Sequence, residues 1–332
     1  MELATIQRIK DVNNVENSDY LDVVSVLGWK VVAKRNDFKA GDLCTYIALD
    51  SILPEKPEFE FMRDRHFRVR TIKLRGQISQ GLVLPLNSIK DHLRFGLQGL
   101  PVDIIEGADL TEFLGIQKYE KVIPAHLSGD IAGDFPNFIP KTDEERLQNY
   151  PEVLSELRGI DCYSTVKVDG TSGTFANYHD ENFICSRRLT KKDTGDTVYS
   201  AIYKKYNISD IFSEIKNTAI QGEIAGPGIQ KNPLNLKSHE LFVFNVYGII
   251  SGRYYDYLDL VNFCRYYNLQ MVDVDRIFIM NHTLEDLLEM AKGVYKSGRT
   301  REGIVIRPTK ERLSNVMKGR MSFKVINNEY KD

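Results

Sequence analysis

The chain has 332 residues, of which 42% are hydrophobic and 27% are charged, a globular composition that can bury the cores of two ordinary domains. Lys and Arg number 44 against 46 Asp and Glu, giving a formal net charge of -2, so no overall positive field attracts nucleic acid and any such site must be a local patch. No apolar run is long enough to predict a membrane span, and we expect a soluble, intracellular protein.

Residues 1–120 are predicted to form a β-rich domain. Short runs of β-branched and aromatic residues, separated by Gly, Asn, Asp and Pro, predict five strands: Leu21–Val26, Trp29–Ala33, Leu43–Ala48, Phe67–Ile72 and Gly81–Pro85. Five strands of this size suit a small closed barrel, and the OB fold is the commonest such barrel that binds oligonucleotides.

The densest basic stretch of the chain lies inside this domain, between Arg63 and Arg75. In a strand, Arg68 and Arg70 would share one face while Phe67 and Val69 pack on the other. This arrangement would present a cationic row to phosphates, and we therefore predict that Arg68 and Arg70 bind RNA. The alternative is an ordinary half-buried strand with one solvated face.

Residues 121–150 contain several prolines and little apolar periodicity, which predicts a linker and the approach to a second domain. Thr142, followed three residues later by Glu145, is typical of a helix capping box.

The stretch Thr165–Gly173 contains a Lys-x-Asp-Gly pattern. Tyr163–Val168 predicts a strand, and Gly170 allows a sharp turn that comes close to a ligand. Lys167 is therefore a candidate nucleophile at the end of a strand. A lysine nucleophile must first lose its proton, so we expect burial or a nearby cation to lower its pKa.

Three further elements follow the lysine pattern, and the last of them is predicted to be scaffold. Tyr199–Lys216 predicts a helix with a broken apolar stripe, and Leu241–Ile249 predicts a buried strand. Thr283–Lys296 predicts an amphipathic helix with a capping box at its start.

Four cysteines are scattered without zinc-site spacing, and we expect them to be reduced and mostly buried: Cys44, Cys162, Cys185 and Cys264.

Further segments follow the lysine pattern in a characteristic order: Cys185–Arg188, Gly222–Gly228, Phe242–Val246, Arg301–Arg307 and Ser322–Val325. Together they resemble the motif series of the covalent nucleotidyltransferases, which include ATP-dependent DNA ligases, RNA ligases and mRNA capping enzymes. The Gly-Glu-x-Ala-Gly-Pro-Gly-Ile-Gln run and the Phe-Val-Phe core are most similar to the RNA ligase branch. A barrel domain placed before the transferase domain is similar to one small class of RNA ligases, whereas DNA ligases and capping enzymes usually carry theirs after it.

The resemblance implies an α+β fold. It would comprise an N-terminal OB-like β-barrel over residues 1–120 and a linker and approach segment over 121–150. An adenylyltransferase domain of the ATP-grasp-like ligase type, with antiparallel sheets and helices, would span 151–332.

The resemblance also implies an ATP-dependent RNA ligase that joins 3′-OH and 5′-phosphate RNA ends, at nicks in duplex RNA, through lysyl-AMP on Lys167 and an adenylylated RNA end. Lys324 would contact the α-phosphate, while Glu223 and Glu302 would hold a divalent metal, Mg or Mn. The ATP-binding residues would be Arg146, Thr165, Asp169, Gly170, Arg187, Arg188 and Phe244. We expect a monomer.

The sequence leaves three alternatives open: a DNA ligase, a capping-type nucleotidyltransferase and a non-catalytic RNA-binding protein. It does not separate Arg187 from Arg188 as the functional arginine. The last motif also departs from the family, which often has Lys-x-Lys where this chain has Ser322-Phe323-Lys324.

Overall fold

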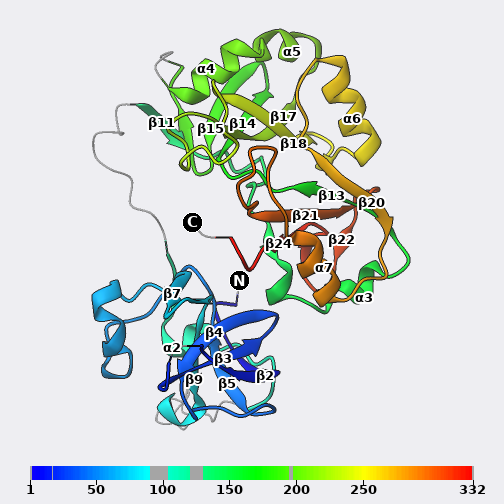
Figure 1. The fold of residues 1–332 in the computed structure, drawn as a ribbon. Helices are drawn as coiled ribbons and strands as arrows, with labels where there is room; N and C mark the ends of the chain where they lie inside the picture. The colour runs from blue at the N-terminus through cyan, green and yellow to red at the C-terminus, as the bar shows by residue number, and fades with distance from the viewer. Residues whose placement is uncertain (1, 17, 90–103, 120–129, 194–196, 331–332) are drawn as a thin grey trace. The chain divides into compact units, whose positions relative to one another are not determined.

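The structure is a computed structural model that describes residues 2–16, 18–89, 104–119, 130–193 and 197–330. The chain divides into two compact units, Met1–Val122 and Ile123–Tyr330, and each is described by itself (Figure 1). Among the described residues, no helix is both long enough and apolar enough to cross a membrane.

The described strands of the first unit form several small sheets, and their hydrogen bonds do not close a single barrel. One sheet contains β1 (Ala4–Arg8), β5 (Leu43–Ile47) and β9 (Leu82–Pro85), and another contains β2 (Asp11–Asn14), β3 (Leu21–Val26) and β4 (Trp29–Lys34). Two pairs complete the strands: β6 (Ser51–Ile52) with β10 (Gln117–Lys118), and β7 (Ile72–Leu74) with β8 (Gln77–Ser79). The helical segments are η1 (Pro57–Arg65), η2 (Leu86–Ile89) and α2 (Thr111–Leu114).

The strand predicted over Phe67–Ile72 is not formed. His66 and Phe67 follow η1 with φ values of 50° and 55°, and this left-handed backbone interrupts an extended conformation. Within residues 67–71 the backbone forms only one isolated β-bridge, between Arg68 and Ile52, and the next strand, β7, begins at Ile72. The predicted alternation nevertheless holds, because Phe67 and Val69 are buried while Arg70 is exposed.

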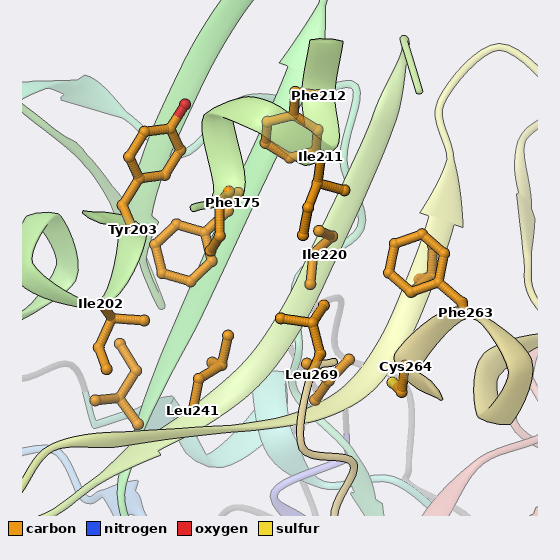
Figure 2. Close-up of a cluster of buried hydrophobic side chains, with 14 of the residues drawn as sticks. Phe175, Ile202, Tyr203, Ile211, Phe212, Ile220, Leu241, Phe263, Cys264 and Leu269 are labelled. Carbon is orange, nitrogen blue, oxygen red and sulfur yellow. The ribbon is translucent and has the colours of Figure 1, made fainter. Parts of the chain in front are cut away.

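The larger sheet of the second unit has seven antiparallel strands. Their order is β11 (Ile131–Asp134), β16 (Leu189–Lys191), β15 (Glu181–Ser186), β14 (Thr171–Tyr178), β17 (Thr218–Ala225), β18 (Glu240–Gly248) and β19 (Arg253–Tyr254). Helices α4 (Val198–Lys205), α5 (Ile208–Glu214) and α6 (Tyr257–Tyr266) pack on one face. Figure 2 shows their contact with the sheet, where Phe212 and Phe263 meet Phe175 and Ile220 in one apolar cluster. The residues of β17 and β18 outside this cluster include the polar Gln221, Glu223 and Asn245.

The second sheet of this unit has five strands in the order β12 (Glu145–Arg146), β24 (Phe323–Ile326), β21 (Gly303–Pro308), β13 (Asp161–Val166) and β20 (Val274–Ile279). Helices α3 (Val153–Leu157) and α7 (Leu284–Ala291), with the short η4 (Leu147–Asn149), pack on the face that carries Cys162, Ile304 and Val325. A small pair, β22 (Leu313–Ser314) and β23 (Gly319–Arg320), completes the unit.

The α+β class is confirmed, and so are several predicted elements. The helix predicted over 199–216 is broken into α4 and α5, because Asn207 adopts a left-handed conformation between them. The capping box of Thr283 and Asp286 is present at the start of α7. All four cysteines are free and buried.

The segment before the lysine motif differs from expectation. The capping box predicted at Thr142 is wrong: no helix follows, and the Thr142 hydroxyl instead lies 2.5 Å from the Ser172 hydroxyl. Residues 131–134 and 145–149 of the expected linker and approach segment contribute β11, β12 and η4 to the second unit. Residues 121–129 of that segment lie outside the described residues.

Candidate active site

The strand register of the five-stranded sheet brings four distant segments into one row. Thr165 pairs with Val305, Val305 pairs with Lys324, and Lys324 pairs with Arg146. Residues directly opposite one another on neighbouring strands project from the same face, and so does a residue two positions further along. Lys167 follows the end of β13, two residues after Thr165, and therefore belongs to this face, opposite the apolar core.

Lys167 forms an ion pair with Glu302, which precedes β21. The Lys167 Nζ donates a hydrogen bond of 2.6 Å to Glu302 Oε2, and the two side chains are only 23% and 18% exposed. The Lys167 backbone N–H also bonds the Gly303 carbonyl at 3.0 Å. Gly303 is required here: its φ is 150°, and a Cβ atom would lie 2.1 Å from the Val325 carbonyl oxygen. The close approach of β21 to β24 at Gly303 therefore fixes the backbone position of the preceding residue, Glu302.

Glu223 reaches the same group of charges from β17 of the other sheet. Burial raises the pKa of Glu223 to about 7, and the negative charges of Glu302 and Asp169 add to this rise. Lys167 and Arg187 oppose it. Residues from both sheets therefore share one electrostatic environment.

Gly170 explains how the lysine loop comes so close to β17. A Cβ atom at this position would lie 2.4 Å from the Ile224 carbonyl oxygen and 2.9 Å from Glu223 Cγ. The glycine of the Lys-x-Asp-Gly pattern is thus needed for packing of the loop against the strand that carries Glu223.

The protonation of Lys167 differs from the sequence-based expectation. Burial alone would lower its pKa, but Glu302, Glu223 and Asp169 together raise it above the ordinary lysine value. The prediction of a lowered pKa is therefore wrong for the protein without ligands, in which Lys167 is a protonated ion-pair partner. Lys324 behaves in the opposite way: burial, assisted by Arg146 and Lys167, lowers its pKa to about 8.

The described residues contain no group of three or more His, Cys, Asp or Glu side chains placed to hold a metal ion. Magnesium-like cations, however, are usually bound by one or two carboxylates together with substrate phosphates and water. Glu223 and Glu302 provide two such carboxylates, and a cation would offset both the burial and the neighbouring negative charge that raise the pKa of Glu223. The donor set therefore fits a divalent cation that arrives with a polyphosphate.

The remaining predicted ATP-binding residues lie around this group. Asp169 accepts a hydrogen bond from the Tyr330 hydroxyl, and Arg187 forms an exposed ion pair with Asp143. Arg188 lies in the bend between β15 and β16, where its carbonyl accepts a hydrogen bond from the Phe135 N–H. Among the other predicted ATP-binding residues, Phe244 is half-buried on β18 and Thr165 is buried on β13, with 2% of its surface exposed.

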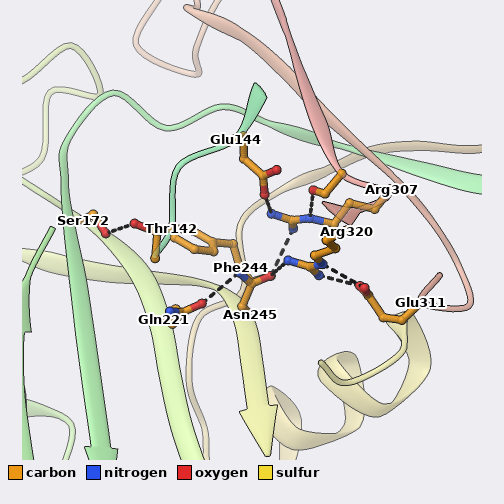
Figure 3. Close-up of polar contacts among 10 residues, drawn as sticks. Thr142, Glu144, Ser172, Gln221, Phe244, Asn245, Arg307, Glu311 and Arg320 are labelled. Atoms are coloured by element: carbon orange, nitrogen blue, oxygen red, sulfur yellow. Dashed lines mark hydrogen bonds and ion pairs between the residues drawn. The ribbon is translucent and has the colours of Figure 1, made fainter. Parts of the chain in front are cut away.

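Arg307 is a central residue of the site that the sequence analysis did not single out. Its guanidinium is 2% exposed and pairs with Glu144 at 2.7 Å. It also donates to the Ser322 hydroxyl at 2.8 Å and to the Phe244 carbonyl at 3.1 Å. Figure 3 shows Arg307 bonded to Glu144 and Phe244. Arg307 is two residues beyond Val305, so the alternation along β21 could have placed it on the site face.

This arrangement explains the departure at Ser322. The small hydroxyl accepts a hydrogen bond from Arg307, whereas a lysine at this buried position would place a second cation against the guanidinium.

A second arginine extends the polar network between the two sheets (Figure 3). Arg320 pairs with Glu311 and donates to the Asn245 side-chain oxygen at 2.9 Å. Asn245 in turn donates to Gln221, which donates to the Pro140 carbonyl. These bonds hold β18 of the large sheet against β23, close to the second sheet.

In the first unit, Arg68 and Arg70 have different environments. Arg68 pairs with Asp50 at 3.0 Å, and its guanidinium carbon lies 3.6 Å from the centre of the Tyr119 ring. Arg70 is exposed, and no described residue forms an ion pair or hydrogen bond with its side chain. Of these two arginines, Arg70 is therefore the one whose guanidinium is not already engaged by described residues.

Comparison with known proteins gives concordant results. A family model described as an OB-fold domain matches residues 3–86, and one described as RNA ligase matches residues 161–326. The solved structure of Naegleria gruberi RNA ligase with PPi is 30% identical, with a TM-score of 0.80 over 99% of this chain and 98% of that chain. Variants of that ligase with AMP and Mn, and with ATP and Mn, are 31% identical at the same coverage, with TM-scores of 0.82 and 0.80. No curated protein matches the chain.

Proposed function

The chain belongs to the RNA ligase family, and on that premise we propose that it is an ATP-dependent enzyme that seals 3′-OH and 5′-phosphate RNA ends at nicks in duplex RNA. The observation that carries this proposal is the ion pair of Lys167 and Glu302, with Glu223 and Lys324 coupled to it electrostatically. The similar ligase from Naegleria gruberi has been solved with ATP and Mn and with AMP and Mn, which supports ATP and a divalent metal here.

The first step in this proposal is attack of the Lys167 amine on the α-phosphate of ATP. A phosphoramidate bond forms between Nζ and phosphorus, and pyrophosphate leaves. Because Lys167 begins as a protonated ion-pair partner, its proton must be released first, and Glu302 at 2.6 Å is the nearest acceptor. Lys324 and Arg146, on the same sheet face, would stabilise the negative charge on the phosphate oxygens.

Two further transfers complete the reaction. The AMP passes from Lys167 to the RNA 5′-phosphate, forming a phosphoanhydride and freeing the lysine. Attack by the RNA 3′-OH then forms the phosphodiester and releases AMP. Glu223 and Glu302 would hold a divalent metal, which supplies charge neutralisation at the phosphates when bound. Half-buried Phe244 would stack on adenine.

Incubation of the protein with α-labelled ATP and Mn or Mg, followed by a denaturing gel, tests the proposal. We expect label to remain on the protein with ATP and not with GTP. Label from GTP would instead indicate a capping-type enzyme, and no label from either nucleotide would indicate a non-catalytic RNA-binding protein. Sealing of nicked RNA in preference to nicked DNA would separate an RNA ligase from a DNA ligase.

We propose that Arg70, rather than Arg68, contacts the RNA backbone, because Arg68 is already engaged by Asp50 and Tyr119. Arg70→Ala should reduce the slope of log K against log salt for nicked RNA by about 1, the contribution of one phosphate contact. Arg265→Ala, an exposed arginine on α6, is the control and should leave the slope unchanged. An unchanged slope for Arg70→Ala would mean that this arginine is only a solvated surface residue.

A further inference from the structure

Tyr295 lies in the turn that joins α7 to β21, and this turn fixes its position. Its backbone N–H bonds the Arg299 carbonyl at 2.8 Å, and its own carbonyl accepts from the Gly298 N–H at 2.8 Å. Val294 and Thr300 form a bridge across the base of the turn. The side chain is only 5% exposed. The ring therefore has one well-determined place in the interior.

The Tyr295 hydroxyl contacts the backbone of both members of the central ion pair. It donates to the Lys167 carbonyl at 2.8 Å and accepts from the Glu302 N–H at 3.2 Å. Lys167 is 128 residues away in the sequence, whereas Glu302 is seven residues away. A single hydroxyl thus joins the end of β13 to the start of β21 at the point where their side chains pair.

Glu302 is held on its other side as well. Its carbonyl accepts a hydrogen bond from the Asn327 N–H at 2.9 Å, and the preceding Arg301 is anchored to the end of α7 through the Ala291 and Met290 carbonyls. Besides the bond from the Lys167 N–H to the Gly303 carbonyl, the Tyr295 hydroxyl therefore supplies a second backbone link between this anchored segment and Lys167.

We propose that Tyr295 is a positioning residue whose hydroxyl sets the separation between Lys167 and Glu302 for attack on ATP. This inference rests on the proposed ligase function. Tyr295 makes no contact with the Lys167 Nζ, so it acts through the backbone and not as an acid or base. Its effect should be large, because a misplacement of about 1 Å at a reacting group can cost about 100-fold in rate.

Tyr295→Phe tests this directly, because it keeps the ring and removes only the hydroxyl. We expect the rate of covalent adenylate formation at saturating ATP to fall by about 10- to 100-fold, with the KM for ATP within about threefold of the unmodified protein. The matched control is Tyr206→Phe. The Tyr206 hydroxyl likewise bridges two groups, Glu240 at 2.7 Å and the Leu241 N–H at 3.3 Å, away from Lys167. This control should form the adenylate at the unmodified rate.

A second substrate distinguishes positioning from a general loss of structure. Sealing of a nicked RNA that already carries AMP on its 5′-phosphate does not use Lys167 as a nucleophile, so Tyr295→Phe should retain that reaction to within about threefold. Equal loss of both reactions, or an adenylation rate like that of Tyr206→Phe, would overturn the inference. If the unmodified protein itself takes no label from ATP, the proposed function fails instead, so the two failures are distinguishable.

Discussion

Replacing Lys167 with alanine is expected to abolish the covalent protein–AMP adduct. The amine of Lys167 is the proposed nucleophile, and the other lysine of the row, Lys324, is held on β24 by its register with Val305 and Arg146. A group fixed on a different strand cannot reach the geometry that Lys167 occupies beside Glu302. The measurement is retention of label from α-labelled ATP on a denaturing gel, with the variant compared at the same protein and metal concentration.

Two further variants test whether the amine of Lys167, rather than its positive charge, is required. Lys167→Arg preserves the positive charge opposite Glu302 but offers a guanidinium that remains protonated, so it should also take no label. Lys296→Ala removes a lysine that is 89% exposed and should label normally. Label on either Lys167 variant would show that another residue accepts AMP, and the assignment of Lys167 would be abandoned.

Arg307→Met is expected to lower the free energy of unfolding by about 3–5 kcal/mol, because it removes the ion-pair partner of the mostly buried Glu144 carboxylate. Arg307 is 2% exposed, and the variant also removes the hydrogen bonds to Ser322 and the Phe244 carbonyl. The measurement is urea unfolding followed by circular dichroism. The single tryptophan, Trp29, lies in the first unit, so its fluorescence would not report on this network.

The matched control for Arg307 is an exposed ion pair of the same unit. Lys310 is 77% exposed and pairs with Asp256, and its replacement by alanine should cost far less stability than Arg307→Met. Adding Glu144→Gln to Arg307→Met should recover part of the lost stability, because the unpaired buried charge is then removed. A double variant no more stable than Arg307→Met would contradict the role assigned to this pair.

The sequence by itself determined the family resemblance and much of the local structure. The order of segments from Lys167 to Lys324 depends only on residue identity, and it indicated an RNA ligase. The comparisons confirm that the chain belongs to the RNA ligase family. The two-residue alternation of strands likewise depends on local pattern. It separated buried Phe67 and Val69 from exposed Arg70.

Two predictions of local structure failed for different physical reasons. The Thr142 capping box did not form, because the segment around Glu144 and Arg146 is used instead to pair with β24 and Arg307. The strand predicted at Phe67 was interrupted by left-handed backbone after η1. At Thr142 a local preference was overridden by contacts with residues far away in the sequence, whereas at Phe67 one local structure, the turn that ends η1, replaced another.

Only the tertiary structure decided the pairing and protonation of the charged residues. Lys167 and Glu302 are 135 residues apart, and Glu144 and Arg307 are 163 apart, so their pairing follows from strand order and register. The pKa of Lys167 is raised because neighbouring carboxylates outweigh its burial, whereas burial beside Arg146 and Lys167 lowers the pKa of Lys324. Electrostatic energy depends on distance and on exposure to solvent, and neither quantity exists until the two sheets have packed together.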